Sequence, residues 1–217
     1  ASDGVGFDNF GRSVAISSDG NTAIVGAYYD NDLGRGSAYI YTRTDSGWIE
    51  EAKLLASDGA SPDYFGWSVA ISGDGNTVIV GAIGDDNEKG TNAGSAYIYT
   101  RNDSGWIEEA KLLANDSITG DSSGWSVSIS DDGNIVIVGT YIDDIHGDRT
   151  GGAYIYNRSN GTWSQKVKLL ASDGSNGDMF GSSVAISGDG DTAIVGAHFD
   201  HNENGDVAGS AYIFDLT

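Results

Sequence analysis

The chain has 217 residues, a formal net charge of −21, 33 glycines, one proline and no cysteine. The negative charge argues against nucleic acid and anionic membrane surfaces as partners, and the lack of cysteine excludes a disulfide framework and a thiolate metal site. Because no apolar stretch approaches the roughly 18 residues of a membrane-spanning helix, membrane insertion is not expected.

The first 60 residues contain four short runs that are typical of β-strands, rich in Val, Ile, Tyr and Ala and bounded by Gly and Asp. They read SVAIS at 13–17, NTAIVGA at 21–27, GSAYIYTR at 36–43 and WIEEAKLLA at 48–56. An Asp-Gly pair between the first two runs favours a tight turn, so these runs are expected to form an antiparallel hairpin. No segment of the chain has a convincing helical period.

The same order of four strands recurs along the chain. The glycine of the second strand marks the period at Gly26, Gly81, Gly139 and Gly196, which gives repeats of 55 to 58 residues. We place them approximately at 5–59, 60–117, 118–174 and 175–217, within a single domain 1–217.

Four-stranded antiparallel sheets that repeat around an axis form a β-propeller, whereas a solenoid is the competing architecture at this period. We predict an all-β propeller built of four antiparallel four-stranded blades. In the fourth repeat, the third strand at residues 209–215 is not followed by a fourth strand. The last blade is therefore predicted to lack its outer strand and to present an open edge.

Phe-Gly pairs at 10–11, 65–66 and 180–181 and Gly-Ala pairs at 26–27, 81–82 and 196–197 resemble FG-GAP repeats. Such repeats form the N-terminal propeller of integrin α-subunits, and the recurring KLLASDG is most similar to the bacterial form. The resemblance implies a non-catalytic adhesion, recognition or assembly module that is secreted or displayed on the cell surface. The third repeat departs from the pattern, with Ser123-Gly124 and Gly139-Thr140 in place of the two pairs.

One end of the predicted propeller is rich in Asp and Asn, because the loops after the second and fourth strands emerge there. Carboxylate and amide oxygens suit Ca²⁺, so the pattern predicts Ca²⁺ as a cofactor, with turn capping by the same side chains as the alternative. The candidate ligands are Asp8, Asp30, Asn31, Asp32, Asp63, Asp85, Asp86, Asn87, Asp121, Asp143, Asp144, Asp178, Asp200 and Asn202.

Integrin-like calcium sites lie in the loop between the first and second strands, but only remnants of that pattern are present here. They include Asp74 and Asn76. A hairpin turn is the preferred interpretation of this loop.

The sequence predicts binding without catalysis. No nucleophile elbow, phosphate loop or dinucleotide fingerprint is present, and evenly repeated carboxylates lack the contrasting environments of an acid and a base. Trp67 and Trp125 are candidate ligand-binding residues that could stack on a sugar ring, and filling gaps between blades is the alternative.

We call the end at which the loops after the second and fourth strands emerge the loop end. The expected partners are a protein or glycan ligand at the loop end, together with self-association or contact with further repeats. A carbohydrate-binding lectin and a structural subunit of a surface fibre or layer are the alternative functions.

Overall fold

The structure is a computed structural model that describes residues 1–30, 33–143, 149–202 and 205–217. Within these residues the regular structure consists of β-strands in four antiparallel sheets, which we call blades 1 to 4. The strands of blades 1 and 2 are β1 (Ser13–Ile16), β2 (Thr22–Ala27), β3 (Ser37–Thr44), β4 (Gly47–Leu54), β5 (Phe65–Ile71), β6 (Thr77–Ala82), β7 (Ser95–Asn102) and β8 (Gly105–Leu112). Those of blades 3 and 4 are β9 (Ser126–Ile129), β10 (Ile135–Thr140), β11 (Gly152–Ser159), β12 (Thr162–Leu169), β13 (Phe180–Ile186), β14 (Thr192–Ala197) and β15 (Ser210–Asp215).

Each blade has its strands in chain order, as in a propeller blade. The first two strands of each blade pair as antiparallel neighbours, so the hairpin prediction is confirmed. Blade 4 contains three strands and ends at β15, which confirms that its outer strand is missing. No described residue belongs to a helix, and accordingly none of the described segments is a helix that could span a membrane.

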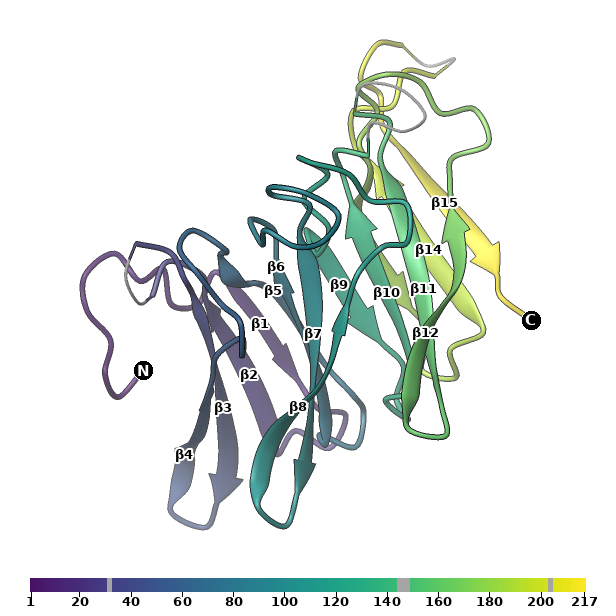
Figure 1. Cartoon of the computed structure of the whole chain (residues 1–217). Coiled ribbons are helices and arrows are strands. Elements are labelled where there is room, and N and C mark those ends of the chain that lie inside the picture. Colours follow the sequence, from purple (N-terminus) through teal and green to yellow (C-terminus); the bar gives the residue numbers. More distant parts are fainter. Residues whose placement is uncertain (31–32, 144–148, 203–204) are drawn as a thin grey trace.

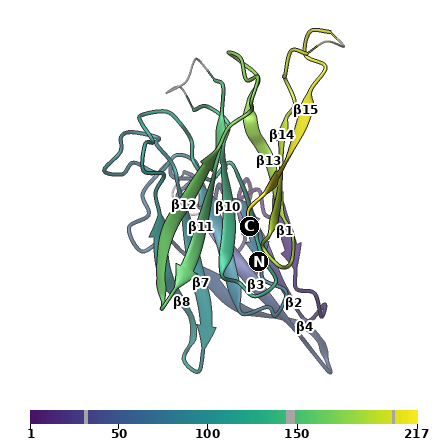
Figure 2. The same ribbon diagram turned by 90° about the vertical axis from the view of Figure 1, so that its right-hand side faces the viewer.

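The blades stand side by side in one row, from blade 1 beside the N-terminus to blade 4 beside the C-terminus (Figure 1). The first strands of successive blades contact one another, β1 with β5, β5 with β9 and β9 with β13. Figure 2 views the row from its C-terminal end, with the two termini overlapping along the line of sight. Blades 1 and 4 stand at opposite ends of the row, so this part of the chain does not close into a ring (Figure 1).

Three hydrophobic cores hold the row together, one between each pair of successive blades. Between blades 1 and 2, Ile24 and Ile40 pack with Phe65 and Val80, and all four side chains are fully buried. Equivalent cores join blade 2 to blade 3 and blade 3 to blade 4. We call the side of a blade that faces the next blade its rear face and the opposite side its front face. A blade inside the row packs against one neighbour on each face, which explains why its strands carry apolar residues on both faces.

The repeated glycines allow the backbones of neighbouring blades to approach closely. A Cβ on Gly81 would lie 2.1 Å from the carbonyl oxygen of Gly124 in the next blade. Gly124 itself has a φ of +91°, which side chains rarely adopt. A Cβ on Gly26 would likewise lie 2.1 Å from the carbonyl oxygen of Gly66, so the Gly-Ala and Phe-Gly pairs of neighbouring repeats meet at one backbone contact between blades.

Candidate functional site

A buried aspartate follows the second strand of every blade, at the loop end of the row. In blade 2, Asp85 accepts hydrogen bonds from Ser95 Oγ at 2.5 Å and Tyr97 OH at 3.0 Å. The ammonium group of Lys111 lies 2.8 Å from the same carboxylate. The equivalent residues of the four blades are Asp30, Asp85, Asp143 and Asp200, all at most 5% exposed.

A second carboxylate joins each of these groups from the loop that leads into the blade. Asp58 accepts a hydrogen bond from Tyr97 OH at 2.9 Å and from Lys111 Nζ at 2.7 Å. Although burial opposes the shift, these hydrogen bonds hold the pKa of Asp58 below its usual value. One tyrosine and one lysine thus connect two aspartates that are 27 residues apart in the sequence, Asp58 and Asp85.

Sequence reasoning missed this tyrosine, lysine and aspartate set. In blade 1 it consists of Tyr39, Lys53 and Asp3, and Lys53 Nζ lies 2.8 Å from Asp30. Blade 3 repeats it with Tyr154, Lys168 and Asp116. Blade 4 keeps Tyr212 and Asp173 but has no fourth strand to supply the lysine. The signal was present, because each of these residues recurs at a fixed place in the repeat.

A third aspartate precedes each Phe-Gly position and closes its own loop. Asp63 accepts a hydrogen bond from the backbone N–H of Ala60 at 2.6 Å. Burial raises the pKa of Asp63, and the charge of Asp85 adds to this effect. The same turn is closed by the equivalent buried residues Asp8, Asp121 and Asp178.

The remaining candidate ligands lie farther along the same loops. Asp86 is exposed and accepts a hydrogen bond from the backbone N–H of Asn92 at 2.7 Å. Asn87 donates to Asp85 at 3.1 Å, and Asn202 donates to Asp200 at 3.3 Å. The predicted ligands Asn31, Asp32 and Asp144 lie outside the described residues.

No three Asp, Glu, His or Cys side chains gather as a metal-binding group in the described part of the chain. The hairpin turn predicted between β5 and β6 is present. Asp74 accepts a hydrogen bond from the backbone N–H of Asn76 at 3.0 Å within this turn. Calcium binding at the loop end stays a prediction.

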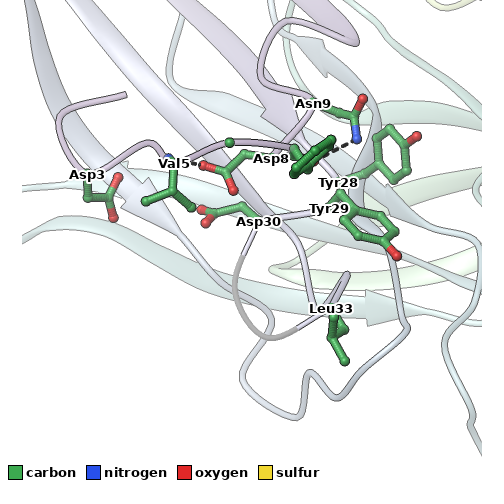
Figure 3. Close-up of a pocket in the computed structure, with 10 residues that line it drawn as sticks. Asp3, Val5, Asp8, Asn9, Tyr28, Tyr29, Asp30 and Leu33 are labelled. Carbon is green, nitrogen blue, oxygen red and sulfur yellow. Dashed lines mark hydrogen bonds between the residues drawn. The ribbon is translucent and has the colours of Figure 1, made fainter.

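A pocket of about 730 Å³ opens at the loop end of blade 1. Its described lining combines Asp8 and Asp30 with the apolar groups of Tyr28, Tyr29 and Leu33. Figure 3 shows the two carboxylates near each other at one side of the pocket and Tyr29 and Leu33 at another. The pocket therefore presents negative charge next to apolar surface.

A row of aromatic side chains crosses the first three blades at the same end. The rings of Trp67 and Trp125 are half-buried, with their centroids 4.8 Å apart. Tyr28 packs on Trp67 at 5.0 Å, and Tyr141 packs on Trp125 at 3.8 Å. The guanidinium of Arg12 lies 4.9 Å from the centre of the Trp67 ring. We call Tyr28, Trp67, Trp125 and Tyr141 the aromatic row.

The aromatic row borders a groove of about 300 Å³ that runs along the first strands of the blades. Arg12, Trp67, Trp125 and Ser182 occupy the same position of the four repeats and all line this groove. The two tryptophans contact each other across a blade boundary and also face the groove. Gap filling is therefore part of their role, and ligand binding stays a prediction.

The family model of the FG-GAP repeat matches residues 1–41, 48–99, 106–156 and 163–214. The chain belongs to the FG-GAP repeat family. Each of the last three matched segments begins in the fourth strand of one blade and ends in the third strand of the next. FG-GAP repeats are found in adhesion-type β-propeller proteins and are typical of extracellular, non-enzymatic proteins. No curated protein matches the chain.

Proposed function

We propose that this FG-GAP chain is a non-catalytic adhesion or recognition module, secreted or displayed at the cell surface, that binds its ligand at the aromatic row. The observation that supports the proposal is the pair Trp67 and Trp125, half-buried and lining the groove. Trp67 lies on β5 and Trp125 directly precedes β9, and the two rings pack on each other, so a ligand meets an ordered surface and little side-chain entropy is lost on binding.

The environment of the carboxylates supports the non-catalytic part of the proposal. In blade 2, both Asp58 and Asp85 bind the same lysine, Lys111. A general acid and a general base need environments that separate their pKa values, and each needs access to a substrate. A carboxylate pair that shares one lysine is better suited to holding the loops in place.

A glycan is the ligand class that the aromatic row favours, which makes a lectin the second candidate function. The flat faces of indole rings pack on the C–H faces of sugars, and the nearby hydroxyl groups of Ser68, Ser126 and Ser182 add polar groups along the groove. A protein ligand with exposed apolar side chains would use the same rings.

A glycan array probed with the whole chain, followed by calorimetric titration of the best glycan, tests this function. Trp67→Ala and Trp125→Ala should each weaken binding at least about tenfold, since loss of one aromatic contact of about 1.4 kcal/mol has that effect. Trp48→Ala is the matched control, because Trp48 is 47% exposed and lies on β4, outside the groove. Binding that survives both groove substitutions contradicts the assignment of the site.

We also propose that Ca²⁺ binds as a cofactor at the loop end. In blades 1 to 3 a lysine already neutralises the buried aspartate, so Ca²⁺ would compete with that ion pair. In the described part of blade 4, no lysine forms an ion pair with Asp173, Asp178 or Asp200, so Ca²⁺ would meet no such competition there.

A further inference from the structure

Each blade boundary inside the chain is held by the same backbone contact. At the first boundary, Tyr64 N–H donates to the carbonyl of Gly34 at 2.8 Å, and Phe65 N–H donates to the carbonyl of Arg35 at 3.2 Å. The pairs at the next two boundaries are Ser122 with Asn92, Ser123 with Ala93, Met179 with Arg149, and Phe180 with Thr150. In these six pairs the front face of one blade supplies the N–H group, and the preceding blade supplies the carbonyl.

A side-chain hydrogen bond runs in the opposite direction across each boundary. Ser68 Oγ of blade 2 donates to the carbonyl of Gly124 in blade 3 at 2.7 Å. Ser13 makes the same bond to Gly66, and Ser126 makes it to Gly181. Every boundary thus has donors and acceptors on both sides in a fixed arrangement.

The front face of blade 1 presents one half of this contact, and none of the described blades lies against it. Asn9 and Gly11 have φ values of 56° and 89°, close to the 58° and 91° of Tyr64 and Gly66, which make the contact in blade 2. Within the described residues, the N–H groups of Asn9 and Phe10 have no hydrogen-bond partner. The front face therefore has the backbone conformation of a bound blade without its neighbour.

The apolar side chains of this face are correspondingly exposed. Phe10 is 42% exposed, Val14 67% and Ile16 59%. Their equivalents in blade 2 are all buried: Phe65 is 0% exposed, Val69 8% and Ile71 9%.

The rear face of blade 4 presents the other half. Val207 has a φ of 56°, like Asn92 and Arg149, whose carbonyls accept hydrogen bonds at the internal boundaries. A β-branched residue rarely adopts this conformation, so a neighbour that binds its carbonyl would offset the strain. The hydroxyl of Ser183, which is equivalent to Ser68, has no partner among the described residues.

Glycine and isoleucine positions on this rear face also show that it lacks a packing neighbour among the described blades. The three atoms nearest to a Cβ on Gly196 would all belong to Ser183 of the same blade, whereas the atom nearest to one on Gly81 belongs to the backbone of the next blade. Ile194 and Ile213 are 41% and 73% exposed, although the equivalent isoleucines of blades 1 to 3 are fully buried. The rear face of blade 4 keeps a space shaped for an incoming Phe-Gly segment.

We propose that a second copy of this chain binds head to tail, its blade 1 front face against the blade 4 rear face. The two faces are complementary in donors, acceptors and apolar side chains, and the chain makes this contact three times internally. Such a contact is heterologous: it gives a closed ring when the rotation between copies completes a circle, and an open filament when it does not. Each copy contributes four blades, and two copies give a total within the usual range of about four to eight for propellers.

Sedimentation or light scattering of the whole chain tests the proposal and is independent of ligand binding at the aromatic row. The expected species has twice the mass of the 22.5 kDa chain. Because each copy carries a charge of −21, association should strengthen as salt screens the repulsion. A chain that stays monomeric at its highest soluble concentration and at high salt overturns the proposal. The same result is expected if repeats of another protein, and not a second copy of this chain, cover the two faces.

Single substitutions then assign the faces. Val14→Asp on the front face and Ile213→Asp on the rear face should each abolish the doubled mass, and Gly196→Ala should do so with one methyl group. Ile107→Asp is the matched control, since Ile107 is 46% exposed on the middle blade 2. Thermal melts check that the variants fold, which is expected for the exposed side chains of Val14 and Ile213. In Gly196→Ala the new methyl group would lie 2.4 Å from the Ser183 hydroxyl, so that side chain has to move.

Mixing the two aspartate variants distinguishes head-to-tail binding from a symmetric contact. The Val14→Asp copy retains an intact rear face, and the Ile213→Asp copy retains an intact front face. The mixture should therefore form a one-to-one pair through a single contact, although each variant alone stays monomeric. A mixture that stays monomeric, or face variants that still associate, overturns the assignment of the two faces.

Discussion

Replacing Phe65 by alanine is the sharpest test of how the blades are held together. Phe65 is fully buried between blades 1 and 2, with ring centroids 5.4 Å from Tyr97 and 6.0 Å from Tyr99. Removing a buried phenylalanine side chain destabilises a protein by about 3–5 kcal/mol, through lost burial and the cavity that remains. Because both tyrosines hydrogen-bond through their hydroxyl groups, they cannot easily move to fill the cavity.

The repeat supplies its own control at the equivalent position of blade 1. Phe10 makes the same kind of edge contact, 5.5 Å from Tyr39, but it is 42% exposed because none of the described blades packs against it. Phe10→Ala should therefore reduce the free energy of unfolding by only about 1 kcal/mol. The difference between the two variants isolates the contribution of the neighbouring blade.

Urea unfolding followed by tryptophan fluorescence and by circular dichroism measures both variants under one set of conditions. Conditions in which the chain is monomeric keep Phe10 exposed. The two optical probes also show whether the row unfolds in one step, since repeat arrays can lose cooperativity. Equal losses for Phe10→Ala and Phe65→Ala, or a loss below about 1 kcal/mol for Phe65→Ala, would refute the packing argument.

Three further predictions concern the loop end and the open edge of blade 4. Millimolar Ca²⁺ should raise the melting temperature above its value in EDTA, and Asp86→Ala should weaken Ca²⁺ binding more than Asp74→Ala; identical melts contradict the calcium proposal. Although burial opposes it, Lys111 holds the pKa of Asp58 below 3.8, so this stabilisation is complete above that pH and is lost as the pH falls further. Lys111→Met should accordingly lower the free energy of unfolding at pH 7 by about 3 kcal/mol, the lower end for a broken buried pair because Asp58 is half exposed, and it should flatten the acid dependence. An unchanged acid profile would count against the ion pair. Adding a copy of residues 103–114 after Thr217 should place a fourth strand beside β15 and raise the melting temperature, more so than the same extension with its lysine changed to methionine.

The strand pattern of the chain was predictable because it depends on local chemistry. Asp-Gly and Gly-Asn pairs favour hairpin turns, and β-branched and aromatic residues between them favour strands, so each repeat specifies its blade. The recurrence of Gly26 and its equivalents then fixed the order of the blades. The missing outer strand of blade 4 followed from the end of the repeat pattern after β15.

The surroundings of the acidic residues were not predictable from the loops alone. The partners of Asp85 are Tyr97 and Lys111, which stand on the third and fourth strands of the blade, whereas Asp85 lies in a loop. A run of Asp and Asn therefore gave the right location but not the ion pairs. The exposure of Phe10 was equally hidden, because a repeat motif does not show whether a preceding blade is present.

The third repeat shows which part of the FG-GAP motif carries the geometry of a blade boundary. It has Ser123 where the other repeats have phenylalanine, yet its N–H still donates to the carbonyl of Ala93 at 2.9 Å. Gly124 keeps a φ of +91°, and its carbonyl still accepts the hydrogen bond of Ser68. The aromatic ring is therefore a source of packing energy that one boundary does without, whereas the glycine backbone is required at all three. Because the blade 1 front face and the blade 4 rear face retain this backbone arrangement, the specificity of the boundary is present at both ends whichever repeat completes them.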